Sequence, residues 1–295
     1  MSTTTTTTET RNIPFHIESE VIPSGDTTAE LNFYASPANG ERPYYYIETP
    51  PAGKPKSNFG TEVVDVKIHD LRGNEEALSL DKEAFAFHKI PSALSYADYD
   101  DDEKVKAVYY PEIESIIKSQ VSGAKEVVIF DHTVRRSNPG APRGPAMRAH
   151  IDQTPWSAAL RLKRHLSEER TEEVVAVGVR YQIVNVWRPI NGAVVSNPLA
   201  FADSSTVEEE DLVPIAHIYP NYEGETAGVK YKEEQKWWYV SGQTSDEITL
   251  IKCFDSWKGE KGEYRRVPHT AFVHPGTPEG ARGRESIEVR CLVVG

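Results

Sequence analysis

Short apolar runs in the C-terminal half of the chain predict a series of β-strands. Residues 179–187, 248–254 and 286–294 are rich in apolar and β-branched side chains, which is typical of β-strands. Shorter runs of the same kind occupy residues 146–151, 237–240 and 269–272. The second half of the chain is therefore predicted to be rich in strands.

The N-terminal half has a mixed pattern. Residues 62–68 alternate between apolar and polar side chains and predict a strand, and residues 126–131 predict a buried one. Apolar residues recur at helical spacing in residues 105–122, which predicts an amphipathic helix. Residues 71–86 are charged and compatible with a helix, and one helix is expected at residues 157–169.

This order of elements predicts a mainly β protein with supporting helices. We expect a double-stranded β-helix core, of the jelly-roll or cupin-like type, built as one domain over residues 29–295. Residues 1–28 begin with a polar run of threonines and are expected to form a partly disordered tail.

The composition narrows the range of partners. Lys and Arg total 33 and Asp and Glu total 45, which gives a net charge of −12 and disfavours binding to a nucleic acid. No run of about 18 apolar residues predicts a membrane span. The two cysteines, Cys253 and Cys291, are too few for a disulfide framework, so a reducing, cytoplasmic setting is expected. An exposed aromatic edge would allow a homodimer.

Two side chains that can bind a metal lie two residues apart, at His150 and Asp152. In a strand, residues with this spacing point to the same face, so an imidazole and a carboxylate could bind one ion together. The pair alone is weak evidence, because it also fits the exposed end of a surface strand.

Later residues strengthen the hypothesis of a metal site. His269 begins a predicted strand and would supply a second imidazole, although His217 and His274 are alternatives. Arg284 and Ser286 then share a strand face, and a guanidinium beside a hydroxyl is a good receptor for a carboxylate. Two histidines and one carboxylate form the ligand set of non-haem Fe(II) oxygenases, and the arginine would bind the distal carboxylate of 2-oxoglutarate.

Two further residues are candidates for binding. Arg188 ends a long apolar run and could reach into the barrel to bind a carboxylate of co-substrate or substrate, or could form a structural salt bridge. Trp238 lies in an aromatic triplet that could line a substrate pocket, although aromatic residues in strands usually belong to the core.

Several linked stretches resemble the fungal asaB-type hydroxylase/desaturase family, which includes gibberellin-desaturase-like and cephem-methoxylase-like proteins. The matching stretches are residues 148–154, 185–190, 197–203, 237–241, 246–256, 269–272 and 284–290. The resemblance implies a double-stranded β-helix that uses Fe(II), 2-oxoglutarate and O2. It implies iron ligands at His150, Asp152 and His269 and a 2-oxoglutarate site at Arg284 and Ser286.

The sequence therefore predicts a 2-oxoglutarate-dependent dioxygenase that oxidises an unactivated C–H bond of a small natural product in secondary metabolism. Hydroxylation, desaturation and oxidative rearrangement all remain open as outcomes. Two alternatives belong to other classes: a redox-neutral jelly-roll metalloenzyme, such as an isomerase or hydrolase, and a non-catalytic β-sandwich binding module.

Overall fold

The computed structural model describes residues 21–137, 144–259, 262 and 264–295. The prediction of a disordered tail falls mainly on residues 1–20, which lie outside the described residues. The first strand, β1 (Thr27–Ala35), already begins within the range predicted for the tail. The prediction of a single domain over residues 29–295 stays a prediction.

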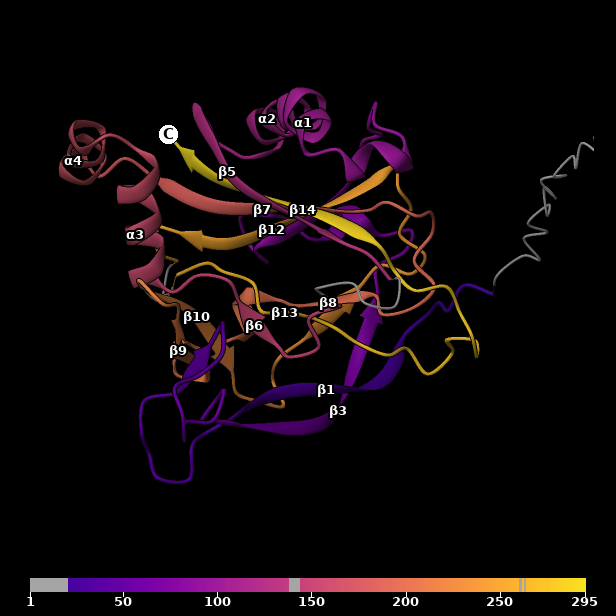
Figure 1. Cartoon of the computed structure of the whole chain (residues 1–295). Coiled ribbons are helices and arrows are strands. Elements are labelled where there is room, and N and C mark those ends of the chain that lie inside the picture. Colours follow the sequence, from indigo (N-terminus) through magenta and orange to yellow (C-terminus); the bar gives the residue numbers. More distant parts are fainter. Residues whose placement is uncertain (1–20, 138–143, 260–261, 263) are drawn as a thin grey trace, which may run out of the picture.

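Two β-sheets lie one above the other and form the body of the molecule (Figure 1). The larger sheet has the strand order β1, β3 (Gly60–Asp70), β11 (Trp237–Tyr239), β8 (Leu199–Ala202), β13 (His269–Ala271), β6 (His150–Ile151), β10 (Glu223–Val229), β9 (Leu212–Ile218) and β2 (Tyr44–Tyr46). The smaller sheet has the order β4 (Phe85–Lys89), β12 (Glu247–Asp255), β7 (Tyr181–Pro189), β14 (Ser286–Val294) and β5 (Glu126–Arg135). This arrangement confirms the predicted mainly β, jelly-roll fold.

Helices cover the smaller sheet and one end of the sheet pair (Figure 1). A continuous helical segment runs through α1 (Asp102–Lys104), a π-helical turn (Val105–Tyr109) and α2 (Tyr110–Gln120). Two further helices, α3 (Pro155–His165) and α4 (Glu168–Val177), follow β6 in the chain. Short 3-10 turns occupy Glu75–Ala77, Tyr96–Asp100, Ser204–Thr206 and Glu209–Asp211.

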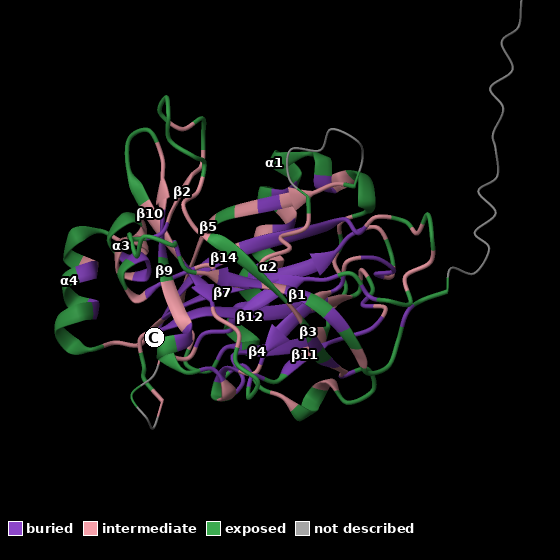
Figure 2. Ribbon diagram, turned by 90° about the horizontal axis from the view of Figure 1, so that it is seen from below, coloured by how far each residue is buried: buried purple, intermediate pink, exposed green. Residues whose placement is uncertain are grey.

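The three central strands of the smaller sheet, β12, β7 and β14, are buried on both faces, which explains their high content of apolar residues (Figure 2). One face packs on α2, where Val186 and Val289 contact the apolar side of the helix through Ile113 and Ile117. The other face points at the larger sheet, where Trp187 and Leu292 share a core with Phe201. These three strands therefore separate a mainly apolar layer next to α2 from the space between the sheets.

The start of α3 is fixed by its sequence. Thr154 precedes the helix in an extended conformation, and its hydroxyl accepts a hydrogen bond from the backbone N–H of Ser157. Pro155 occupies the first turn, where the missing N–H costs nothing. Because the helix begins three residues after Asp152, which itself follows β6, its first turn lies beside His150 and Asp152.

Two predictions of helix fail in detail. Residues 71–86 form only the short turn at Glu75–Ala77 and then enter β4, because Phe85 and Phe87 are buried against Phe201. The single helix predicted at residues 157–169 is two helices, which are divided at Ser167, the N-cap of α4. The predicted strands at residues 62–68, 126–131, 179–187, 248–254 and 286–294 are confirmed as parts of β3, β5, β7, β12 and β14.

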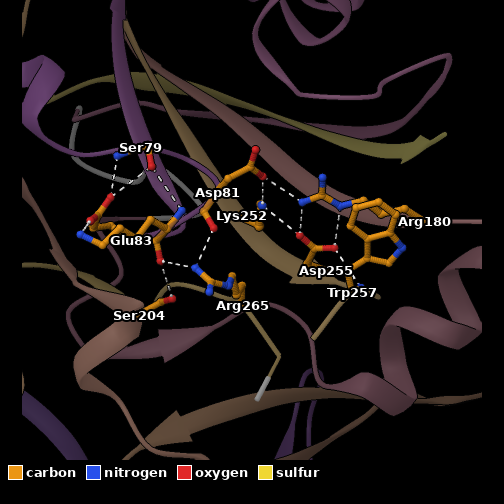
Figure 3. Close-up of polar contacts among 10 residues, drawn as sticks. Ser79, Asp81, Glu83, Arg180, Ser204, Lys252, Asp255, Trp257 and Arg265 are labelled. Atoms are coloured by element: carbon orange, nitrogen blue, oxygen red, sulfur yellow. Dashed lines mark hydrogen bonds and ion pairs between the residues drawn. The ribbon is translucent and has the colours of Figure 1, made fainter. Parts of the chain in front are cut away.

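A buried ion-pair network anchors the far end of the smaller sheet (Figure 3). Lys252 and Asp255 are almost fully buried, and the Lys252 ammonium donates to carboxylate oxygens of Asp255 at 2.9 Å and of Asp81 at 3.0 Å. Arg180 binds the other side of Asp255 and also donates to Asp81. Burial would raise the pKa of Asp81, but the charge of Lys252 and the hydrogen bond from Arg180 lower it below its ordinary value.

We expect Asp255→Ala to destabilise the protein by about 3 kcal/mol, because it leaves two cations without their shared buried carboxylate. Chemical denaturation monitored by tryptophan fluorescence measures this change. The matched control is Glu210→Ala, which removes an exposed ion pair with Lys232 at 3.9 Å and should change stability by less than about 0.5 kcal/mol. Equal effects of the two substitutions would contradict a structural role for the network.

Candidate metal centre

Three side chains that can bind a metal converge between the two sheets. One ligand atom each from His150, Asp152 and His269 lies within 4.8 Å of the other two. His150 on β6 and His269 on β13 are directly paired across the larger sheet, and their ring centroids are 4.5 Å apart. The backbone thus fixes the separation of the two imidazoles.

The hydrogen bonds of the two imidazoles decide which nitrogen faces the centre. Nδ1 of His150 lies 2.8 Å from the carbonyl oxygen of Arg148, and Nδ1 of His269 lies 3.2 Å from that of Val267. A carbonyl can only accept, so each Nδ1 carries a proton, and Nε2 of each ring faces the centre, where its lone pair can bind a metal once Nε2 carries no proton. Burial and the charge of His150 lower the pKa of His269 to about 4, so this ring is neutral at pH 7.

Asp152 is ionised and oriented by neighbours from the smaller sheet. Burial would raise its pKa, but the hydrogen bond from His150 and the charge of Arg290 hold the pKa well below its ordinary value. Asn185 on β7 donates to Oδ2 of Asp152 at 2.7 Å, and Nε of Arg290 lies 3.7 Å from the same oxygen. Oδ1 therefore faces His150, at 3.3 Å from Nε2.

The pKa of His150 is raised, because the hydrogen bond and charge of Asp152 outweigh the opposing effect of burial. The proton that His150 and Asp152 share shows that the space between these two side chains attracts positive charge. A divalent cation there would replace that proton and also reach His269. Two neutral imidazoles and one carboxylate, with no thiolate, suit Fe(II) and leave further coordination positions open.

A pocket beside the three side chains contains an arginine without a counter-charge. Arg284 lines this pocket together with His150, Asp152, His269 and Trp187, and its side chain is almost fully buried. Its Nε and Nη1 atoms make no hydrogen bond within the described part of the chain. The guanidinium lies over the ring of Trp187, 5.3 Å from its centroid.

Burial, followed by the charge of Arg135, lowers the pKa of Arg284 to about 9. Buried polar atoms are nearly always hydrogen-bonded, so two unsatisfied guanidinium nitrogens call for an explanation. A carboxylate of a bound molecule would supply both the hydrogen bonds and the missing negative charge. The residues present therefore fit a diacid that binds the metal at one end and Arg284 at the other.

The remaining predicted residues are placed less simply. Ser286 is buried on the same face of β14 as Glu288 and Arg290, but it does not line the pocket. Thr270, which the sequence reasoning did not consider, does line it. The structure groups His269 with His150 and Asp152; His217 lies in a neighbouring pocket, and His274 accepts a hydrogen bond from the N–H of Gly276.

The expectation that Arg188 reaches into the space between the sheets does not hold. Successive residues of a strand point to opposite faces, and Asn185 and Trp187 already point inward. Arg188 therefore points to the helical side, where it donates to the hydroxyl of Tyr109 at 2.9 Å and to the carbonyl of Ser245 at 2.6 Å.

Trp238 shares the face of the metal centre but is not adjacent to it. The strand register pairs Trp238 with Phe201, Phe201 with His269, and His269 with His150. Trp238 is thus two strands, or about 10 Å, from His269, with Phe201 between them. Its ring packs against His69 at 4.9 Å, and its role in substrate binding stays a prediction.

Sequence reasoning assigned no role to Asn185, Arg290 or Glu288. β14 carried a signal, because Ser286, Glu288 and Arg290 alternate with apolar residues and mark one face of the strand as polar. β7 carried none, because its polar residues Gln182, Asn185 and Arg188 do not alternate. The inner face of β7 could therefore not be read without the partner strands.

Comparisons with known proteins agree with this geometry. The family described as an oxidoreductase/YMDC permease-like domain matches residues 31–294. In the described residues, no helix is both long enough and apolar enough to cross a membrane. The hydroxylase/desaturase poxK of Penicillium oxalicum is 34% identical, and the alignment covers 92% of each chain.

A second relative, the Fe(II)/2-oxoglutarate-dependent dioxygenase nvfI of Aspergillus novofumigatus, is 34% identical over 90% of this chain and 96% of its own. The solved structure of the iron and alpha-ketoglutarate-dependent endoperoxidase NvfI superposes with a TM-score of 0.80 at 31% identity. That match covers 92% of this chain and 98% of the other.

We expect His150→Ala and Asp152→Ala each to lose stoichiometric Fe(II) after anaerobic reconstitution, because the two protein ligands that remain in each variant bind the ion too weakly to hold it. Metal analysis of the desalted protein measures this. His88→Ala is the control, since His88 lies on β4 at the outer edge of the smaller sheet and should leave the iron content unchanged. Full iron content in either ligand variant would refute the site.

Proposed function

Because this chain belongs to the fungal asaB-type hydroxylase/desaturase family of Fe(II)/2-oxoglutarate-dependent dioxygenases, we propose that His150, Asp152 and His269 bind its iron. The chain is an oxidoreductase of this class, with Fe(II), 2-oxoglutarate and O2 as its cofactor and co-substrates. Its reaction is the oxidation of an unactivated C–H bond in a small natural product of secondary metabolism.

One observation carries the assignment of 2-oxoglutarate to its site. The buried, unpaired guanidinium of Arg284 lines the same pocket as the three metal-binding side chains. 2-Oxoglutarate has a keto-acid end that can chelate a metal and a distal carboxylate that can pair with a guanidinium. Arg284 would thus fix the orientation of the co-substrate, and Trp187 would support the flat face of the guanidinium.

Fe(II), when bound, supplies the activation of O2 that couples decarboxylation of 2-oxoglutarate to succinate with removal of hydrogen from the substrate. The protein contributes position and a dry environment. Asn185 and Arg290 hold Asp152 in one orientation. Phe201 and Trp187 form an apolar wall beside the metal-binding side chains, and such a wall keeps water from reactive species.

The redox-neutral alternative shares the metal ligands but gives Arg284 no function. An isomerase or hydrolase would not need a buried cation beside its metal. A binding module would need neither the three metal-binding side chains nor the buried arginine beside them. We infer a small-molecule substrate, which the enzyme hydroxylates, desaturates or rearranges.

The function is tested by adding Fe(II) and 2-oxoglutarate to the protein without O2. We expect the weak visible charge-transfer band of a keto-acid chelated to iron. Admission of air should then release succinate, faster when a substrate is present. A protein that binds Fe(II) but shows neither the band nor succinate would exclude 2-oxoglutarate as co-substrate.

Arg284→Met should weaken 2-oxoglutarate binding by about 100-fold, since it removes charge-assisted hydrogen bonds to a buried carboxylate. The same substitution should raise the stability of the protein without co-substrate by about 1 kcal/mol, because it removes an unpaired buried charge. Thermal denaturation with and without 2-oxoglutarate measures both effects. A less stable variant with unchanged affinity would show that Arg284 is structural.

A further inference from the structure

A second pocket shares Asp152 with the first but has a different lining. It lies between α3 and the hairpin of β9 and β10, and these two parts are neighbours in the structure (Figure 1). Leu160, Arg161 and Arg164 line it from the helix, and Tyr219 and Tyr222 line it from the hairpin. Any molecule in this pocket contacts the immediate surroundings of the proposed iron.

The acidic residues of this pocket are already paired. Glu223 and Glu225 form ion pairs with Arg42 at 2.8 and 3.1 Å, and Glu225 also accepts a hydrogen bond from the hydroxyl of Thr154. Asp152 is bonded to His150 and Asn185. None of the three carboxylates is therefore available as the main partner of a further cation.

In contrast to these carboxylates, the two arginines of α3 have no ion-pair partner among the described residues. Arg161 lies over the ring of Phe130 at 5.0 Å, and Arg164 lies over that of Tyr222 at 5.1 Å. Neither guanidinium makes a hydrogen bond or an ion pair with any residue that the structure describes. Burial and the charges of Arg164 and Arg290 lower the pKa of Arg161, as expected for a partly buried cation without a counter-ion.

We propose that this pocket binds the substrate and that Arg161, assisted by Arg164, pairs with a carboxylate of that substrate. The proposal rests on the function proposed above and adds the substrate class, an apolar molecule with an acid group. Tyr219 and Tyr222 stack at 4.1 Å and form, with Leu160, a flank for the apolar body. Pairing at Arg161 would fix which end of the molecule lies beside Asp152.

A second molecule of 2-oxoglutarate is a poorer match for this pocket. It has no apolar body to place against the tyrosines, and Arg284 in the first pocket already offers a buried site for its distal carboxylate. An uncharged substrate would leave Arg161 without its counter-charge, at the cost that buried cations carry.

The test uses two acids, decanoate and 4-phenylbutyrate, and their primary amides, which have nearly the same shape without the charge. Each is titrated into the anaerobic protein loaded with Fe(II) and saturating 2-oxoglutarate, and the shift of the charge-transfer band gives the Kd. We expect the acids to bind at least about tenfold more tightly than the amides, as for a charge-assisted hydrogen bond.

Variants then assign the preference to one side chain. Arg161→Met should abolish the difference between acid and amide, and Arg161→Lys should keep part of it. Lys163→Met is the matched control, because it removes an exposed charge from the same helix outside this pocket. The affinity for 2-oxoglutarate should stay the same in all three variants.

Equal binding of acids and amides, or no binding of the acids, would overturn the proposal. So would a loss of 2-oxoglutarate affinity in Arg161→Met, since Arg161 would then serve the co-substrate. These results differ from a failure of the proposed function, in which the band itself does not form in the unsubstituted protein.

Discussion

The pairing of His150 with His269 across β6 and β13 is the contact on which the proposed site depends. β6 has only two residues, yet it lies in the middle of the larger sheet, with β13 on one side and β10 on the other. The backbone N–H of Ala149 also donates to the carbonyl of Asn32 at 2.8 Å. A slip of one residue in this register would turn both His150 and Asp152 to the opposite face. Strands from distant parts of the chain therefore fix the geometry that metal binding requires.

The smaller sheet supplies the second half of the site and its electrostatics. Asn185 and Arg290 reach across from β7 and β14 and control the carboxylate of Asp152. The same face provides Trp187 beside Arg284. Because the opposite face of these strands packs on α2, their position is set by a mainly apolar layer that takes no part in the chemistry. The face that packs on α2 thus stabilises the strands, and the opposite face of the same strands carries the residues of the site.

Uncompensated positive charge is a common feature of the two pockets that meet at Asp152. Arg284 in one pocket and Arg161 in the other lack anionic partners among the described residues, whereas the buried charges at the far end of the sheet, Lys252 and Asp255, are fully paired. Burial of an ion costs less free energy when the ion is paired with an opposite charge than when it is unpaired. Arg284 and Arg161 each line a pocket, where an anionic ligand could pair with them, whereas the buried Arg188, which also lacks an anionic partner, donates hydrogen bonds to Tyr109 and Ser245.

The sequence by itself determined the β-rich class and the long strands, because residue type carries that information. It predicted His150, Asp152, His269 and Arg284 as the candidate site from residue type, spacing and order, with His217 and His274 left as alternatives to His269. It could not determine that Arg188 points to the helical side, since a strand buried on both faces shows no alternation that would mark its inner face. It also missed β4, because the burial of Phe85 depends on contact with Phe201, far away in the sequence. The pairing of strands decided which polar residues meet, and the charges of each pocket followed from that pairing and from the packing of α3 against β10.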